Sequence, residues 1–238
     1  MKGRYKKQMD TYVALDLEMT GLKPKEDKII EIGAVLVETG EIRDTFSTLI
    51  NPGRVLASEI TELTGITDAA LRDAPRIEEV LTELSEFIGG RNLLGHGIGF
   101  DYAFLKRAFV NGGMTFEKYG MDTLKLSRKF LPDLPSRRLQ ALCAYYGIVQ
   151  QAHRALEDAR AAHFLYLKLR DQFYTEEDFC FRPLICRVKR ECPAGRRQID
   201  RLLSLMQRHK LPIERDVESM SRNEVSRLTD QILAKYGR

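Results

Sequence analysis

Residues 11–22 read TYVALDLEMTGL, an apolar run typical of a buried β-strand that ends in two acids, Asp16 and Glu18. Side chains alternate between the two faces of a strand, so these two carboxylates point to the same face. Neighbouring like charges are unfavourable unless a cation neutralises them or one of them is protonated. The pair therefore predicts either a cation site or, as the ordinary alternative, two solvent-exposed acids on an edge strand.

The segments after this strand predict the rest of the fold. Residues 28–52 hold two β-branched runs separated by Thr39 and Gly40, which is a hairpin signal. Helical spacing follows over 58–88, and then strands at 92–97 and 118–121 alternate with helices that we place at 102–111, 123–130, 138–146 and 155–173. Strands first, then strand–helix alternation, predict an α/β domain with a mixed sheet flanked by helices, ending near residue 175.

The composition is that of an ordinary globular protein, with 43% hydrophobic and 30% charged residues in 238. No apolar run approaches the ~18 residues of a membrane-spanning helix. The basic N-terminal residues are not followed by a secretory apolar core. The four cysteines are too dispersed for a disulfide framework. These features predict a reduced, cytoplasmic protein without a membrane partner.

Charge is divided unevenly along the chain. Residues 181–238 hold 14 Lys and Arg against 7 Asp and Glu, whereas the other 180 residues hold 24 and 27. A basic tail indicates a polyanionic partner or, with equal weight, helices made basic for solubility. Its last helix begins with a capping box, Ser221 and Glu224. A helical module of about 45 residues is small for independent stability, so we expect it to pack on the body or on a partner.

Two further segments carry acids where apolar neighbours surround them. In GHGIGFDYAFL, residues 95–105, Asp101 follows a strand end and precedes a helix. A plain N-cap would explain it, but its neighbours place it beside the core, next to the strand that carries Asp16. In HRALEDARAAHFLYL, residues 153–167, Asp158 shares a helix face with apolar residues, which is costly unless compensated. His153 is expected in the loop that enters this helix.

Four carboxylates that converge from three segments leave few physical options. Hard oxygen ligands in a partly buried cluster suit Mg²⁺ or Mn²⁺ and not zinc. Two such cations ~3.5–4 Å apart stabilise the attacking and the leaving oxygen of a phosphoryl displacement. A nearby histidine can accept a proton from the attacking water at physiological pH.

The three motifs DLEMTG, GHGIGFDYAFL and HRALEDA resemble, in order and spacing, those of the DnaQ-like (DEDDh) 3′–5′ exonucleases of the ribonuclease H-like fold. The resemblance spans residues 10–173. It implies that Asp16, Glu18, Asp101 and Asp158 bind two divalent cations, Mg²⁺ or Mn²⁺, and that His153 is the general base. It also implies hydrolytic release of nucleoside monophosphates from a 3′ end.

Longer stretches bear on the substrate. Residues 60–75, ITELTGITDAALRDAP, and the segments 121–132 and 139–148 resemble the exonuclease subunit or domain of replicative DNA polymerase III. By this resemblance, the pocket for the 3′-terminal nucleotide is lined by Met19, Thr20, Leu63, Thr64, His96 and Phe100. The motif DLEMTGL, however, is often found in oligoribonucleases, which degrade short RNA. Gly97 also departs from the pattern of many relatives, which have Asn at this position.

The sequence therefore predicts an exonuclease domain over residues 1–175, a connector over 176–193 and a helical module of unassigned role over 194–238. DNA is the favoured substrate, and nucleic acid with a free 3′ end is the expected partner. A DNA polymerase or another replication or repair protein is a candidate partner. The alternatives are an RNA-directed exonuclease of the oligoribonuclease or ribonuclease T type and a non-catalytic nucleic-acid-binding protein on a nuclease fold. The latter predicts a broken catalytic position, and none is found.

Overall fold

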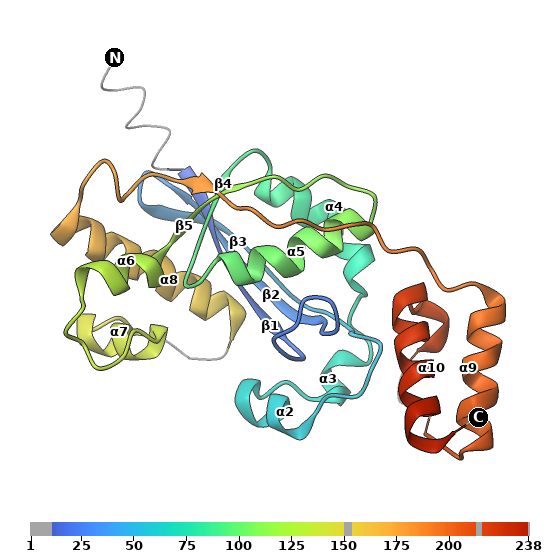
Figure 1. Cartoon of the computed structure of the whole chain (residues 1–238). Coiled ribbons are helices and arrows are strands. Elements are labelled where there is room, and N and C mark those ends of the chain that lie inside the picture. The colour runs from blue at the N-terminus through green and yellow to red at the C-terminus, as the bar shows by residue number, and fades with distance from the viewer. Residues whose placement is uncertain (1–10, 150–153, 213–215, 238) are drawn as a thin grey trace.

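The protein is built on a six-stranded sheet of order β3-β2-β1-β4-β5-β6. The computed structural model describes residues 11–149, 154–212 and 216–237. The strands are β1 (Thr11–Met19), β2 (Ile29–Glu38), β3 (Glu41–Leu49), β4 (Asn92–Gly95), β5 (Tyr119–Asp122) and β6 (Arg182–Pro183). The first three strands are antiparallel, whereas β4 is parallel to β1 and to β5. The predicted mixed α/β sheet is therefore confirmed (Figure 1).

The hairpin between β2 and β3 turns where the sequence predicts it. Thr39 and Gly40 have φ values of 54° and 83°, and two positive φ values suit a tight turn between twisted strands. The short strand β6 is not predicted by the sequence. Its two residues lie in the segment expected to be a connector, and they pair antiparallel with Tyr119 and Gly120 of β5. Two residues of strand carry too little pattern to be recognised without the neighbouring edge.

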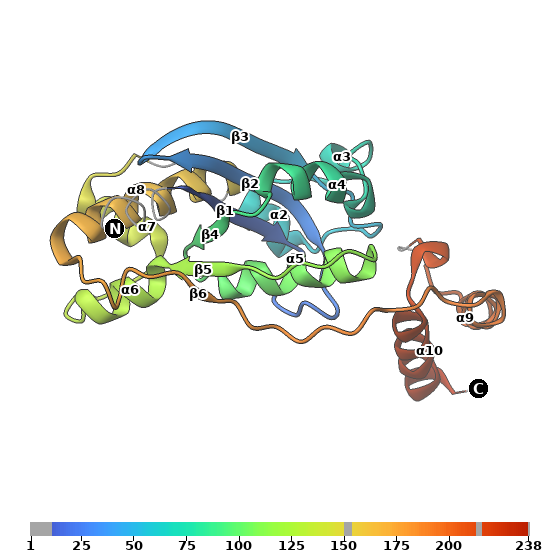
Figure 2. The same cartoon turned by 90° about the horizontal axis from the view of Figure 1, so that it is seen from above.

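Helices cover both faces of the sheet (Figures 1 and 2). They are α2 (Ser58–Thr64), α3 (Asp68–Leu71), α4 (Ile77–Ile88), α5 (Gly99–Asn111), α6 (Thr123–Phe130), α7 (Leu139–Tyr146) and α8 (Ala155–Phe173). Buried side chains of α4 and α5 share one core cluster with one face of β1, whereas those of α6, α7 and α8 share another with the opposite face. The strand that carries the two acids therefore lies between two packed layers.

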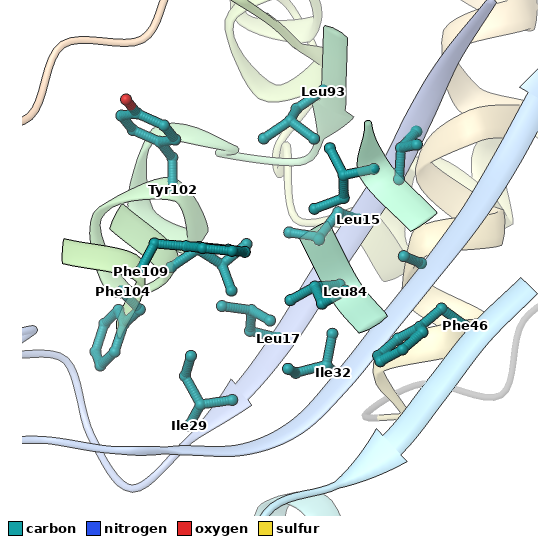
Figure 3. Close-up of a cluster of buried hydrophobic side chains, with 14 of the residues drawn as sticks. Leu15, Leu17, Ile29, Ile32, Phe46, Leu84, Leu93, Tyr102, Phe104 and Phe109 are labelled. Carbon is teal, nitrogen blue, oxygen red and sulfur yellow. The ribbon is translucent and has the colours of Figure 1, made fainter. Parts of the chain in front are cut away.

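The first core cluster is drawn in Figure 3. Leu15 and Leu17 of β1 point into it together with Leu84 of α4 and Phe109 of α5. Full burial of a side chain of this size contributes about 1.5–3 kcal/mol to stability. Because side chains alternate along β1, placing Leu15 and Leu17 in this layer directs Asp16 and Glu18 toward the opposite layer, where α8 lies.

The second layer contains a buried polar pair. His163 of α8 is completely buried, and its Nδ1 lies 2.8 Å from the hydroxyl oxygen of Tyr12. The rings of Tyr12 and Tyr166 pack edge to face, with their centroids 5.6 Å apart. Burial lowers the pKa of His163 to about 4 because the charged imidazolium is poorly solvated there. His163 is therefore a packed core residue in its neutral form.

The C-terminal residues form helices of their own, α9 (Arg196–Arg208) and α10 (Arg222–Tyr236), with the short 3₁₀-helix η1 (Val217–Ser219) between them. The predicted helical segment is thus confirmed. The capping box is present: Glu224 N–H donates to Ser221 Oγ over 3.3 Å, and Ser221 N–H donates to Glu224 Oε2 over 2.9 Å. Over the part of the chain that the structure describes, no helix has the length and apolar character needed to cross a membrane.

We predict that His163 makes the protein less stable as the medium becomes acidic. An unfolded histidine takes up its proton near pH ~6.5, whereas folded His163 stays neutral to about pH 4. The unfolded state therefore binds more protons between these values, and stability decreases as the pH falls through this window. Between pH ~7.5 and pH ~5, we expect the free energy of unfolding of the wild type to fall by about 2 kcal/mol more than that of His163→Gln, measured by urea unfolding. If the free energy of unfolding depended on pH in the same way in the wild type and in His163→Gln, this prediction would be contradicted.

Candidate active site

Three carboxylates from two elements meet at the end of β1. Oxygen atoms of Asp16, Glu18 and Asp158 all lie within 4.8 Å of one another. Asp16 and Glu18 are on the face of β1 that α8 covers, and Asp158 is in the first turn of α8. The segments that carry these acids are separated by about 140 residues in the sequence, so the fold alone brings them together.

A glycine allows α8 to approach the sheet so closely. Gly33 of β2 is paired with Asp16 of β1. A Cβ atom on Gly33 would lie 2.0 Å from the backbone nitrogen of Leu156 and 2.1 Å from the carbonyl carbon of Ala155. No side chain fits in this space. Gly33 therefore places the N-terminal turn of α8 directly against the strand pair, at the level of Asp16.

Glu31 is a further acid of this region that sequence reasoning missed. It lies opposite Glu18 across the β1–β2 pair and is 1% exposed. Its Oε2 accepts a hydrogen bond from the backbone N–H of Ala155 over 3.1 Å, and its Oε1 accepts from Arg154 Nη2 over 2.9 Å. The N-cap residue Arg154 makes no side-chain cap itself. Glu31 therefore caps α8 from the neighbouring strand. The available signal is an acid inside the apolar run IIEIGAV.

The fourth predicted acid, Asp101, lies in the first turn of α5 and is 5% exposed. The backbone near Asp101 and Leu17 lowers the pKa of its carboxyl group and so partly offsets the effect of burial. Among the neighbouring charges, that of Asp101 raises the pKa of Asp16 the most. All four predicted acids are therefore in one neighbourhood, three of them within the 4.8 Å cluster and Asp101 beside it.

The electrostatics of this neighbourhood favour a bound cation. Burial raises the pKa of Asp16 well above its ordinary value, and the charges of Asp101, Asp158 and Glu18 raise it further. Burial also raises the pKa of Glu18 to about 7 and that of Asp101 above its ordinary range. Burial and mutual repulsion therefore both oppose full ionisation of the cluster. A divalent cation removes this repulsion, and an all-oxygen donor set fits Mg²⁺ or Mn²⁺.

The six residues predicted to line a nucleotide pocket are all described, and they differ in what they offer a ligand. The exposed fractions of Leu63 and Phe100 are 53% and 37%, so both present apolar surface to solvent. Met19 packs against the first core cluster. Thr64 is buried, and its hydroxyl donates to the carbonyl oxygen of Ile60 over 2.8 Å.

His96 and Thr20 are tied into the protein by hydrogen bonds. Nε2–H of His96 donates to the carbonyl oxygen of Arg137 over 2.8 Å, so Nδ1 is the acceptor for the Thr123 hydroxyl at 2.9 Å. Burial lowers the pKa of His96, which keeps the ring neutral. Both ring nitrogens are thus engaged, and a ligand could touch only the ring carbons. Thr20 Oγ1 accepts from the backbone N–H of Lys28 over 3.0 Å.

The backbone conformation at Gly97 explains its departure from the family pattern. Gly97 has a φ of 90°, in the left-handed region that glycine and asparagine adopt more readily than other residues. Its N–H donates to Asp122 Oδ1 over 2.9 Å. Glycine therefore preserves the main-chain geometry here while offering no side chain. The predicted general base, His153, lies outside the described residues.

Comparison with known proteins assigns the class of enzyme. Residues 13–166 match the protein family described as Exonuclease (RNase_T). The chain belongs to this family, and the predicted membership of an exonuclease family is confirmed.

Relatives of known sequence are much longer than this chain. A PolC-type DNA polymerase III of Clostridium perfringens (strain 13 / Type A) is 40% identical over 168 residues, which are 68% of this chain and 12% of that protein. The corresponding Bacillus subtilis (strain 168) protein is 42% identical over 164 residues, 67% of this chain and 11% of that protein. The chain thus spans only about a tenth of the length of these relatives.

Solved structures show the same fold. Exonuclease X in complex with 5′ overhanging duplex DNA superposes with a TM-score of 0.58 at 25% identity, over 71% of this chain and 96% of that chain. The nuclease domain of 3′hExo, a DEDDh family member bound to rAMP, superposes with a TM-score of 0.59 at 24% identity, over 68% and 93%. The second similarity is one of fold alone.

We predict that Glu31→Ala destabilises the protein by about 1–3 kcal/mol, because the buried amide of Ala155 loses its acceptor. Glu31→Gln is the matched control, since it removes the same charge but keeps a carbonyl oxygen for that amide. We expect a smaller loss for Glu31→Gln in denaturant unfolding. Equal stability of Glu31→Ala and the wild type would show that Glu31 does not cap α8.

Proposed function

We propose that this protein is a 3′–5′ exonuclease that hydrolyses DNA from its 3′ end to nucleoside monophosphates with the help of two divalent cations, Mg²⁺ or Mn²⁺. The observation that carries the proposal is the cluster of Asp16, Glu18 and Asp158 within 4.8 Å, with buried Asp101 beside it. DNA is preferred as the substrate because the relatives at 40–42% identity are DNA polymerases. The structure of exonuclease X in complex with duplex DNA supports the same choice.

In this proposal the four acids Asp16, Glu18, Asp101 and Asp158 hold the cations. Bound there, divalent cations supply charge that stabilises the attacking and the leaving oxygen of the phosphodiester. The acids come from β1, α5 and α8, and the packed layers of the sheet hold these elements in place. The donors therefore need little rearrangement when substrate binds, which favours electrostatic stabilisation of the transition state.

His153 is proposed as the general base. It precedes Arg154, and Glu31 holds Arg154 at the start of the helix that carries Asp158. The imidazole would take a proton from the attacking water. The bond between the phosphorus of the departing nucleotide and the 3′ oxygen of its 5′ neighbour would break, which leaves a new 3′ hydroxyl on the shortened strand. The neutral form of histidine needed for this step predominates above its ordinary pKa of about 6.5.

The 3′-terminal nucleotide is proposed to lie against Met19, Thr20, Leu63, Thr64, His96 and Phe100. Phe100 and Leu63 have the exposed apolar surface on which a base can stack or pack. The hydrogen bonds of His96, Thr20 and Thr64 within the protein fix the shape of the pocket wall. These three residues would thus position the nucleotide mainly by shape.

The proposal extends to the arrangement of the chain and its surroundings. Residues 1–175 would form the exonuclease domain, 176–193 the connector and 194–238 a module that assists it. A DNA polymerase is the favoured protein partner, since the relatives that match residues of this domain are polymerases. A cytoplasmic location is part of the proposal, because the proposed substrate is DNA and the favoured partner is a DNA polymerase.

RNA is the alternative substrate, and the DLEMTGL spelling is the observation that favours it. Product analysis on matched 3′-labelled single-stranded DNA, mismatched duplex DNA and RNA, each with Mg²⁺ or Mn²⁺, separates the two. Mononucleotide release mainly from RNA would replace the DNA proposal.

We predict that Asp16→Asn and Asp158→Asn each lower the rate of mononucleotide release on the order of 10³-fold or more. Removing one of several repelling charges should leave the cation-free protein at least as stable as the wild type. Asp44→Asn, an exposed acid on β3, is the control. In the wild type, Mn²⁺ should raise the unfolding temperature, and in the two site variants it should not. Full activity in either site variant would refute the assignment.

For His153→Ala we predict a loss of turnover of about 10²–10⁴-fold, the usual contribution of a general base. The Mn²⁺ concentration that half-saturates the thermal stabilisation should stay nearly the same, because His153 is not proposed as a ligand. Parallel losses of turnover and cation affinity would argue against the base role.

A further inference from the structure

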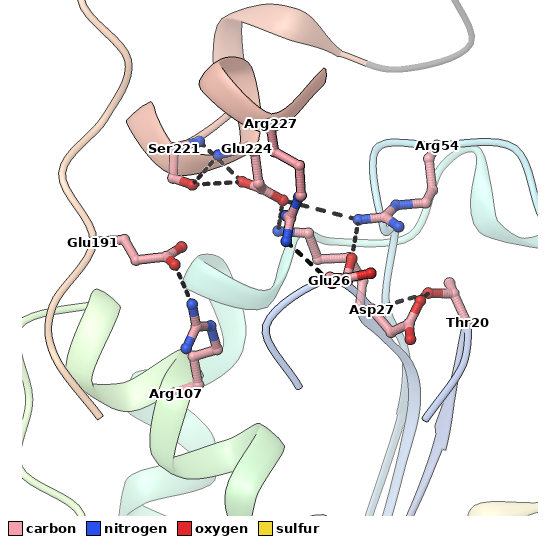
Figure 4. A network of polar contacts seen from close by, with 10 residues as sticks. Thr20, Glu26, Asp27, Arg54, Arg107, Glu191, Ser221, Glu224 and Arg227 are labelled. Atoms are coloured by element: carbon pink, nitrogen blue, oxygen red, sulfur yellow. Dashed lines mark hydrogen bonds and ion pairs between the residues drawn. The ribbon is translucent and has the colours of Figure 1, made fainter. Parts of the chain in front are cut away.

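The C-terminal helices are joined to the exonuclease domain by charged contacts. Helices α9, η1 and α10 bury an apolar cluster of their own that is separate from the clusters of the sheet. A cavity of about 400 Å³ lies between the two parts, lined by residues such as Ile29, Phe104 and Met220. Hydrogen bonds and ion pairs join the two parts at this junction (Figure 4). The position of the module is therefore set by particular polar residues.

Glu224, at the start of α10, is the centre of these contacts. Its carboxylate accepts from Lys28 Nζ over 2.9 Å, and Arg54 Nη2 lies 3.9 Å away. The side chain of Glu224 is 9% exposed. Burial opposes its charge, but Lys28 and the hydrogen bonds from Ser221 outweigh burial and lower the pKa of Glu224 to about 2. Glu224 is thus ionised and paired at any physiological pH.

Other contacts reach the same part of the domain. Nη1 of Arg227 in α10 lies 3.3 Å from Glu26 Oε1. Arg54 Nη2 donates to the carbonyl oxygen of Glu26 over 2.8 Å. Asp216 pairs with Arg76, and its backbone N–H donates to the carbonyl oxygen of Gly53 over 3.0 Å. The module therefore contacts the loop between β1 and β2 and the segment 51–57 that leads into α2.

These two segments continue directly into the proposed nucleotide pocket. Thr20 N–H donates to the carbonyl oxygen of Lys28 over 2.9 Å, and Lys28 N–H donates to Thr20 Oγ1 over 3.0 Å. The side chain of Asp27 also accepts from Thr20 Oγ1, over 3.3 Å. Lys28, which pairs with Glu224, is thus locked by its backbone to Thr20. Segment 51–57 leads directly into α2, which begins at Ser58 and carries Leu63 and Thr64.

A third contact involves the helix that carries Asp101. Arg107 of α5 pairs with Glu191 of the connector, and both side chains are less than a fifth exposed. Arg107 lies nearly two turns after Asp101 on the same helix. The connector and the module therefore contact three segments: the loop 20–28, segment 51–57 and α5. Each of them carries, or leads directly into, residues of the proposed site.

We propose that the C-terminal module braces the loop of residues 20–28, called here the brace loop, and that Glu224 is the positioning residue that sets the wall of the 3′-nucleotide pocket. The inference rests on the proposed function, because it assigns the module to the substrate side of that same site. Glu224 does not touch the acid cluster, so it acts on substrate binding and not on the chemical step. Loss of its charge frees Lys28 and, through the two hydrogen bonds that join Lys28 to Thr20, also Thr20.

The test compares Glu224→Gln with Glu218→Gln, each in the 238-residue chain. Glutamine retains the capping role at this helix position, so Glu224→Gln removes the ion pair without removing the cap. Glu218 is an exposed acid of the same module that pairs with Arg196, also in the module, and it is the matched control. Two readouts that need no catalysis are used. One is amide hydrogen exchange of residues 20–28, and the other is the affinity for a fluorescent single-stranded DNA oligonucleotide in EDTA.

We expect Glu224→Gln to speed exchange in the brace loop about tenfold and to weaken oligonucleotide binding about five- to tenfold, the size expected for loss of one partly solvent-exposed hydrogen bond. Lys28→Met should have the same effects, and the double variant should add little to either single change. Exchange and affinity unchanged in Glu224→Gln would overturn the proposal, as would faster exchange with unchanged affinity. Wild-type protein that binds DNA but releases no mononucleotides would overturn the proposed function instead.

Discussion

The close approach of α8 to the β1–β2 strand pair is the constraint on which the candidate site depends. At Gly33, the backbone of Ala155 and Leu156 occupies the volume that any side chain would need. Glu31 then fixes the first turn of the helix through the Ala155 amide and the Arg154 guanidinium. Only with this turn against the sheet does Asp158 come within reach of Asp16 and Glu18.

This packing concentrates negative charge in a partly buried place, which is unfavourable in the absence of a cation. Burial first, and then the charges of neighbouring carboxylates, raise the pKa values of Asp16, Glu18 and Asp101. The packed cores on both faces of the sheet provide the stability that holds the acids together. A cation bound at this site would relieve the repulsion, so the stability of the scaffold and the affinity of the proposed site would be linked.

Local patterns in the sequence account for most of the fold. The alternation of β1, the Thr39-Gly40 turn and the 3.6-residue period of α6 and α8 depend on neighbours within a few residues, so the strands and helices follow from them. The two-residue strand β6 does not, because it exists only through pairing with β5. Glu31 shows the same limit: an acid within IIEIGAV has no evident partner until β2 meets the start of α8.

The sequence by itself determined the family, since residues 13–166 match an exonuclease family, and the order and spacing of its acid motifs singled out the residues to which the chemistry is proposed to belong. Only the tertiary structure decided how these acids meet, which hydrogen bonds leave His96 without a free ring nitrogen, and where the C-terminal helices attach. The physical reason is one of range. Period and propensity act over a few residues, whereas charge repulsion, close packing at Gly33 and the Glu224 ion pair act between segments that only the folded chain brings together.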